Sequence, residues 1–128
     1  IATNTTHAAN QSLLKQMPYD AVNDFEPVTK LGTIVLALAI HPSVPAKSVR
    51  DLVAYAKANP GKLSYATTGS GTYPHLAGEI MKQATGINMV HIAYRDTALI
   101  ADIMSGTVQV GISTAASSVN AVASRSVN

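Results

Sequence analysis

The strongest constraint on the fold is an alternation between short apolar stretches and longer stretches with helical spacing. The expected strands are residues 28–40, 63–67, 88–94 and 108–112, and the expected helices are residues 49–58, 74–84, 98–104 and 117–123. Strands that alternate with helices of about ten residues usually form a parallel sheet with helices on both faces. The sequence therefore predicts an α/β fold with a parallel-type sheet flanked by helices.

Capping residues mark several boundaries of these elements. Ser48 is a typical N-cap, and Asp51 in the first turn that follows suits the helix dipole. Residues 59–61, Asn-Pro-Gly, end this helix, and Gly86 closes the helix expected at 74–84. The turns after the strands, at 42–47, 68–73, 95–98 and 113–118, are expected to gather where ligands bind such sheets.

The first 27 residues lack this alternation. Residues 1–10 are rich in Thr and Asn, which predicts a polar loop. Residues 11–17 have room for one short helical turn before Pro18, and residues 24–27 are typical of another turn.

Residues 63–80 combine a strand, a glycine-rich turn and a helix start. The turn contains Gly69 and Gly71 beside hydroxyl side chains, and Pro74 follows in the helix. The first N–H groups of a helix have no intrahelical partner and carry partial positive charge, and glycines let the backbone approach an anion. The pattern indicates a site for a carboxylate or another small anion.

Two other interpretations of this turn are a nucleotide site and a simple connection between the strand and the helix. The third glycine of a dinucleotide motif would fall at Pro74 and is missing, and no P-loop lysine follows, which argues against nucleotides. The turn would otherwise serve only to connect the strand with the helix.

Other polar residues give weaker signals. His75 and Glu79, four residues apart, form half of a metal site at most, and local hydrogen bonding is the better interpretation. His91 lies among apolar strand residues, as a hydrogen-bonded core histidine does. Arg95 and Asp96 either bind a ligand or pair with each other.

No catalytic constellation is evident. Ser113 and Thr114 have a hydroxyl nucleophile but no G-x-S-x-G elbow around them. The groups gathered at the expected turns are neutral donors, which suit binding better than chemistry. No metal or cofactor is expected, and the sequence favours a binding protein over an enzyme.

Composition excludes several classes of protein. Apolar residues make up 47% and charged residues 12%, which is typical of a globular domain, and the net charge is only +2. Lys and Arg are scattered, so neither nucleic acid nor a membrane surface is expected as a partner. Cysteine is absent. The longest apolar run, residues 34–40, is far shorter than the roughly 20 residues of a membrane span.

Several stretches together resemble one family, the Bug-type extracytoplasmic solute receptors of tripartite tricarboxylate transport systems. The resembling segments are residues 5–10 (TTHAAN), 18–20 (PYD), 24–25 (DF), 42–48 (PSVPAKS), 56–63 (AKANPGKL), 69–72 (GSGT), 74–79 (PHLAGE), 90–94 (VHIAY) and 108–110 (VQV). They follow the family's order and cover nearly the whole chain up to about residue 110.

The resemblance implies one domain of a type II periplasmic binding-protein fold, which closes on a small carboxylate and passes it to membrane subunits of a secondary transporter. It implies a ligand site in two loops, comprising Thr3, Thr6, Thr67, Thr68, Gly69, Ser70, Gly71, Thr72, Tyr73 and His75. It also implies a truncated piece, in which residues 1–23 are a remnant of a first domain and residues 24–128 form the second.

Two alternatives to a receptor remain. One is an α/β enzyme domain of hydrolase type that acts at Ser113, and the other is a self-associating structural fragment with no ligand. With half of the cleft missing, we expect this chain alone to bind a carboxylate weakly.

Overall fold

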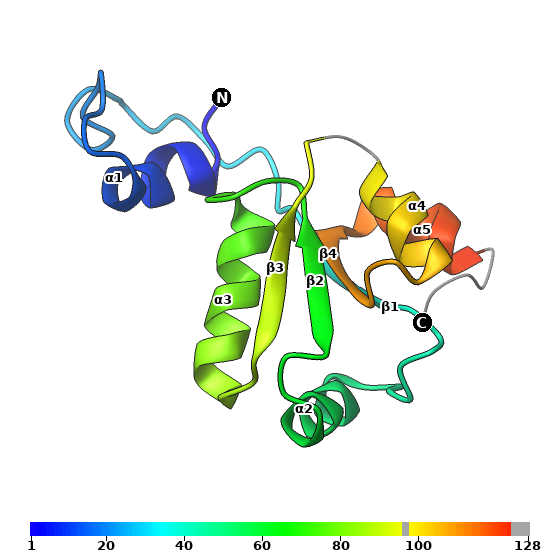
Figure 1. Ribbon diagram of the computed structural model, residues 1–128. Helices are drawn as coiled ribbons and strands as arrows, with labels where there is room; N and C mark the ends of the chain where they lie inside the picture. The colour runs from blue at the N-terminus through cyan, green and yellow to red at the C-terminus, as the bar shows by residue number, and fades with distance from the viewer. Residues whose placement is uncertain (96–97, 124–128) are drawn as a thin grey trace.

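The centre of the molecule is a four-stranded sheet, and the computed structural model describes residues 1–95 and 98–123 around it. The strands are β1 (Leu36–Ile40), β2 (Leu63–Thr67), β3 (Met89–Ala93) and β4 (Val110–Thr114), in the order β1-β4-β2-β3. β2 runs parallel to β3 and β4, whereas β1 is antiparallel to β4. Figure 1 shows helices on both sides of this sheet.

The first face of the sheet is covered by α2 (Val49–Ala58) and α3 (Tyr73–Thr85). The core on this face is made of side chains from the sheet, from these helices and from the loops between them, among them Leu52, Tyr65 and Met89, which are at most 1% exposed. Because α2 and α3 turn their apolar positions inward, burial of this stripe holds both helices on the sheet.

The second face is covered by α4 (Ala98–Ser105) and α5 (Ala115–Ala123). Its core is smaller and centres on Ala66, Leu99 and Ile103. The apolar residues of β2 thus reach both faces of the sheet, as expected for a strand with neighbours on both sides and helices above and below.

Most of the predicted helices and strands are confirmed. α2, β2, α3, β3 and α4 begin and end within one residue of the predicted bounds, and α5 begins two residues early. The Ser48 Oγ accepts a hydrogen bond from the Asp51 N–H at 3.1 Å, so the predicted N-cap is present. Gly86 ends α3 with a φ of 70°, in the left-handed region that glycine adopts without strain.

The strand predicted over residues 28–40 is wrong for its first eight residues. β1 comprises only Leu36–Ile40, and its pairing with β4 starts at Leu36 opposite Thr114. Val28 and Leu31 are 93% and 76% exposed. An apolar run suits a strand, but strand hydrogen bonds need a partner, and residues 28–35 lie outside the sheet.

The antiparallel direction of β1 corrects a second prediction. The turn at 42–47 follows β1 and therefore lies at the opposite edge of the sheet from the ends of β2, β3 and β4. An antiparallel edge strand on a parallel sheet is common, so the α/β class itself is confirmed. The last strand, β4, starts two residues later than predicted, because the Val108 N–H bonds to the carbonyl of Asp102 in α4 and not to a neighbouring strand.

The polar loop predicted for residues 1–10 is also wrong. A π-helical turn, η1 (Thr5–Ala9), continues into the short helix α1 (Asn10–Leu13). Thr3 and Thr6 support its start reciprocally, since the Thr3 N–H donates to the Thr6 Oγ1 and the Thr6 N–H to the Thr3 Oγ1. Thr and Asn disfavour helix interiors but cap helix starts, and the composition alone did not separate the two cases.

Candidate functional site

The turn between β2 and α3 is closed by hydrogen bonds to one carbonyl oxygen. The hydroxyls of Thr67 and Thr72 both donate to the Gly69 carbonyl, at 3.2 and 2.7 Å. Gly69 and Gly71 have φ angles of 123° and 76°, which side chains larger than hydrogen rarely adopt. Both glycines are therefore required by the backbone path, and the turn keeps one shape.

The first turn of α3 presents backbone N–H groups that have no intrahelical acceptor. Thr72 is the N-cap residue, but its side chain does not cap the helix because its hydroxyl is bonded to the turn. Pro74 lies in this first turn, where a missing N–H costs nothing. The remaining N–H groups and the helix dipole favour an anion at this end of α3.

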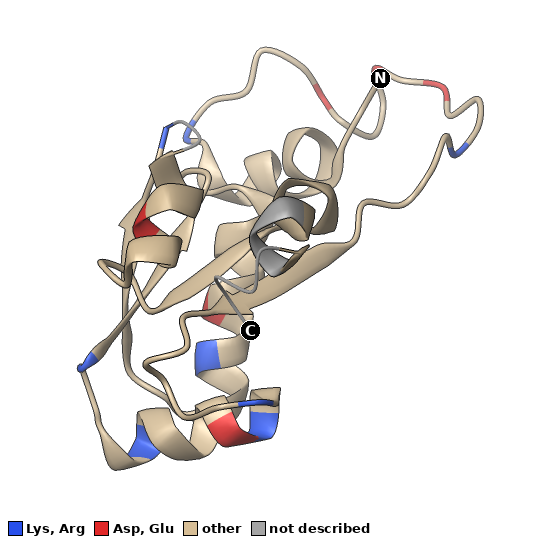
Figure 2. Ribbon diagram, turned by 90° about the vertical axis from the view of Figure 1, so that its right-hand side faces the viewer, with Lys and Arg blue, Asp and Glu red and all other residues tan. Residues whose placement is uncertain are grey.

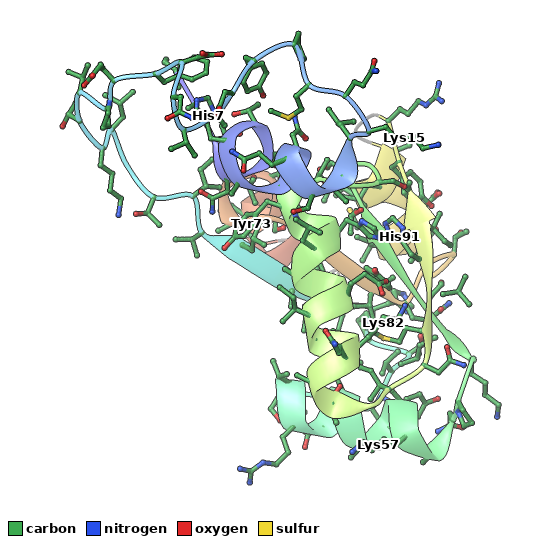
Figure 3. All side chains as sticks on the ribbon, turned by 90° about the vertical axis from the view of Figure 1, so that its left-hand side faces the viewer. His7, Lys15, Lys57, Tyr73, Lys82 and His91 are labelled. Atoms are coloured by element: carbon green, nitrogen blue, oxygen red, sulfur yellow. The ribbon has the colours of Figure 1, made fainter. Side chains whose placement is uncertain are left out.

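The N-terminal segment lies across the same end of α3 (Figure 3). The Tyr19 hydroxyl donates to the Thr6 carbonyl at 2.6 Å, and the His7 ring meets Phe25 edge-on with ring centroids 4.6 Å apart. A Cβ at Gly71 would approach the Leu13 Cδ1 to 3.2 Å, so α1 lies directly against the turn. These contacts bring the N-terminal threonines to the glycine-rich turn.

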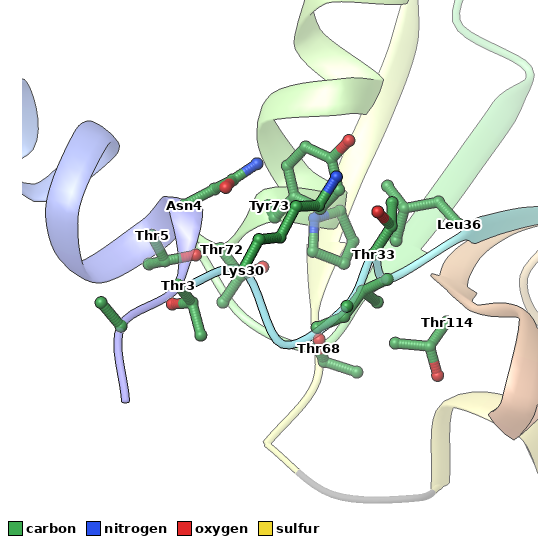
Figure 4. Close-up of a pocket in the computed structure, with 14 residues that line it drawn as sticks. Thr3, Asn4, Thr5, Lys30, Thr33, Leu36, Thr68, Thr72, Tyr73 and Thr114 are labelled. Atoms are coloured by element: carbon green, nitrogen blue, oxygen red, sulfur yellow. The ribbon is translucent and has the colours of Figure 1, made fainter. Parts of the chain in front are cut away.

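The two segments border a cavity of about 440 Å³ (Figure 4). Residues 30–36, which lead into β1, and the end of β4 complete its wall. Threonines dominate the lining: Thr3, Thr5, Thr33, Thr68, Thr72 and Thr114. Hydroxyls that donate or accept, beside apolar atoms of Ile34, Leu36 and Pro74, are typical of a small-molecule site.

One positive charge reaches this cavity. Among the described residues that line it, Lys30 has the one charged side chain. Figure 4 shows Lys30 among the side chains that line the cavity. Figure 2 shows the other Lys, Arg, Asp and Glu residues scattered over the molecule. The local charge balance at the cavity is therefore positive, which suits an anionic ligand.

The residues predicted for the site divide into two groups. Four of them line the cavity, namely Thr3, Thr68, Thr72 and Tyr73. The others, Thr6, Thr67, Gly69, Ser70, Gly71 and His75, lie outside its lining. Thr6, Thr67 and His75 bond instead to backbone groups of the loops that form the wall.

Five polar lining residues were not among the predicted site residues: Asn4, Thr5, Lys30, Thr33 and Thr114. For Thr114 a signal existed, because β2 and β4 are parallel and their carboxyl ends meet at one edge of the sheet. Lys30 and Thr33 lie in an extended stretch without periodicity. Only the path of the folded chain brings them to the cavity.

A polar cluster fills the space between α3 and the sheet below the turn. The Tyr65 hydroxyl and the Lys82 ammonium both donate to the Glu79 Oε1, at 2.6 and 2.8 Å. The bond from Lys82, followed by the bond from Tyr65, lowers the pKa of the Glu79 carboxyl. Burial, followed by the bond to Glu79, raises the pKa of Tyr65. Glu79 therefore pairs locally, as the sequence suggested.

The chemistry expected elsewhere finds little support in the geometry. The Ser113 side chain is 2% exposed, and its hydroxyl shares a 2.8 Å hydrogen bond with the Ser118 hydroxyl, so a substrate has no access to it. Arg95 is exposed, and its expected partner Asp96 lies outside the described residues. In the described part of the chain, no group of three or more His, Cys, Asp or Glu side chains is placed to hold a metal. Nor does that part contain a helix with the length and apolarity to cross a bilayer.

The chain belongs to the family described as "Tripartite tricarboxylate transporter family receptor", whose profile matches residues 1–126. Members of this family are solute-binding proteins and not enzymes. A UPF0065 protein of Bordetella pertussis is 36% identical over 98 residues, covering 77% of this chain and 30% of the relative. The chain thus spans less than a third of that protein's length.

Two solved structures share the fold. A structure described as a periplasmic transporter matches with a TM-score of 0.86 and 33% identity, covering 99% of this chain and 43% of that one. An R. palustris protein solved with adipate matches with a TM-score of 0.82 and 28% identity, covering 98% of this chain and 42% of its own. The predicted fold, one domain of a periplasmic binding protein, is confirmed.

Proposed function

We propose that this chain is part of a periplasmic receptor that binds a small organic carboxylate and passes it to the membrane subunits of a tripartite tricarboxylate-type transporter. The observation that carries the proposal is the threonine-lined cavity at the start of α3, with Lys30 in its wall. The adipate in a related structure supports a dicarboxylate as the ligand class.

The chemistry of the wall suits a carboxylate. One carboxylate group accepts hydrogen bonds from the first N–H groups of α3 and from Thr68, while the Lys30 ammonium neutralises charge. The threonine hydroxyls on the other side of the cavity, such as Thr3 and Thr5, are neutral donors for a second polar end. A volume of about 440 Å³ accommodates a ligand of a few carbon atoms.

The predicted division of the chain remains a proposal, with residues 1–23 belonging to a first domain and residues 24–128 forming the second. It is supported by a second hollow of about 960 Å³ beside residues 21–32, with Val22, Phe25, Val28 and Leu31 in its wall. These side chains are 46–93% exposed here. We propose that the rest of the receptor covers them, and that the ligand cavity is complete only then.

The proposal is tested by recording amide shifts of the ¹⁵N-labelled chain during addition of adipate. We expect shifts at Thr68, Thr72 and Tyr73, with an affinity in the millimolar range because the cavity is open. The neutral diol of the same length, 1,6-hexanediol, is the control and should leave these amides unchanged. Equal shifts with the diol, or shifts confined to other parts of the chain, would overturn the carboxylate site. Micromolar affinity for adipate would contradict the proposal that the cavity is incomplete in this chain.

Replacing Lys30 tests the charge in the wall. Lys30→Met should weaken adipate binding by at least about tenfold, since a hydrogen bond to a charged group contributes about 1.5–3 kcal/mol. The matched control is Lys57→Met, which removes a lysine from the last turn of α2, outside the cavity lining. If both variants weaken binding equally, the effect comes from net charge and Lys30 has no specific role.

A further inference from the structure

Two histidines hold the ends of the glycine-rich turn from below. The Gly71 N–H donates to the His75 Nδ1 at 3.0 Å, while the Thr67 Oγ1 and the His91 Nε2 are 2.7 Å apart. The Thr67 hydroxyl in turn donates to the Gly69 carbonyl. The two imidazole rings stack, with centroids 4.1 Å apart and planes inclined by 26°. A continuous set of contacts therefore runs from Gly71 through both rings back to Gly69.

The two histidines differ in what a proton would do. His75 accepts a hydrogen bond through Nδ1, so this nitrogen carries no proton. Protonation of Nδ1 would make it a donor that faces the Gly71 N–H, which is also a donor, and the bond would be lost. The Thr67 hydroxyl donates its proton to the Gly69 carbonyl, so in its contact with His91 the Nε2–H of the ring is the donor. A second proton on this ring would go to Nδ1 and would leave the bond to Thr67 intact. Only protonation of His75 breaks a bond to the turn.

A charged His75 has an alternative partner. Its Nε2 lies 4.0 Å from the Glu79 Oε1, on the side of the ring away from Gly71. A small rotation of the ring toward this carboxylate would replace the Gly71 bond by a charge-assisted one. His75 thus has two arrangements: a neutral one that holds the turn and a charged one that pairs with Glu79.

The titratable groups around the rings come from α3, β2 and β3. On α3, Lys82 donates to Glu79 and lies 5.7 Å from the centre of the Tyr65 ring. On β2, that tyrosine ring lies 4.9 Å from the His91 ring. Burial, followed by the positive charge of His75, lowers the pKa of His91. His91 is therefore harder to protonate than a free imidazole, and its ring stacks on that of His75.

We propose that neutral His75 is a positioning residue for the ligand turn, and that its protonation releases the Gly71 N–H, loosens the turn and weakens carboxylate binding. The inference rests on the proposed function of the cavity, but its structural half, the link between His75 and Gly71, holds without any ligand.

The structural half is tested on the ligand-free chain by NMR, following the Gly71 amide and the His75 Cε1–H against pH. We expect both signals to titrate with one midpoint. In His75→Asn the side-chain oxygen lies close to the position of Nδ1 and accepts without titrating, so the Gly71 amide should lose its pH response. A Gly71 response that persists in this variant, or that does not follow His75 in the parent chain, overturns the inference.

The matched control is His41→Asn. The His41 Nδ1 also accepts a backbone N–H, that of Ser43 at 3.2 Å, but in the turn at the other edge of the sheet. This substitution should leave the Gly71 response unchanged. If it abolishes the response as well, the pH effect is global and the assignment to His75 is wrong.

The functional half is tested with adipate at pH 7.5 and 6.0. The affinity of the parent chain should fall about three- to tenfold more than that of His75→Asn, since one hydrogen bond to the turn is lost. Protonation of adipate itself affects both proteins equally, so it does not contribute to this difference. If the affinities of the parent chain and of His75→Asn fall equally between pH 7.5 and 6.0, protonation of His75 has no effect on carboxylate binding. Absence of adipate shifts at both pH values counts against the proposed function as well, while the ligand-free titration is unaffected by that outcome.

Discussion

Residues 1–35 and residues 36–123 of this chain are built in different ways. The structure describes every residue of the first part, and none of them is buried. The second part contains the sheet and both cores, with side chains such as Leu52 and Tyr65 fully enclosed. Yet the cavity takes Thr3 and Lys30 from the first part and Thr68 and Thr72 from the second. One wall of the site is rigidly supported, and the other depends on a few local contacts.

The largest expected effect comes from the same substitution made in each part. Leu52→Ala removes a fully buried side chain from α2 and should lower the free energy of unfolding by about 2–5 kcal/mol. Leu31→Ala removes a side chain that is 76% exposed and should change it by at most about 0.5 kcal/mol. Urea denaturation of both variants measures the difference. Similar losses would show that residues 28–35 pack in solution.

A smaller effect is expected from added methyl groups. A Cβ at Gly78 would collide with the Tyr65 ring, which is 0% exposed and bonded to Glu79, so the ring cannot move aside. Gly78→Ala should therefore cost about 1–3 kcal/mol, despite the better helix propensity of alanine. At Gly32 nothing lies within 4 Å of the added atom. Gly32→Ala should be neutral or slightly stabilising, and a large loss there would contradict the open structure of this segment.

The smallest effect concerns the pH dependence of stability. Because burial lowers the pKa of His91 in the folded state, the unfolded state binds the proton more readily. Stability from this group is complete above the unfolded pKa of about 6.5 and declines as the pH falls toward the lower folded value. Urea midpoints between pH 7.5 and 5 should therefore decrease less for His91→Gln, whose amide still reaches the Thr67 hydroxyl. If the urea midpoint falls equally with pH in both proteins, the His91 side chain is exposed to solvent in the folded state.

Much of the sheet and its helices was predictable because the signals are local. The strand at 63–67 follows from alternation, α2 follows from Ser48 and the Asn-Pro-Gly stop, and α3 ends where Gly86 permits a left-handed residue. The glycine-rich turn was recognisable because Gly69 and Gly71 stand beside hydroxyl residues. The helical turn at residues 5–9 was missed because Thr and Asn are found both in loops and at helix starts, whereas α1 at 10–13 overlaps the short helical turn expected in residues 11–17.

The cavity was predictable only in part. Residues on the turn were found because the site lies next to them in the chain, and Thr68 and Thr72 are in its wall. Lys30 was missed because nothing in the residues around it distinguishes a ligand-facing lysine from a solvated one. The local hydrogen bonding predicted for His75 is confirmed, since its Nδ1 accepts from the Gly71 N–H, while its contact with a ligand stays a prediction.

The sequence alone determined most of the helices and strands, the α/β class and the family, because periodicity, caps and turn residues act over a few neighbours along the chain. Only the tertiary structure decided the direction of β1, the exposure of residues 28–35 and the set of side chains around the cavity. These depend on which segments meet across the sheet. The wall of the cavity combines residues as distant in the sequence as Thr3 and Thr114, and no local pattern encodes this combination.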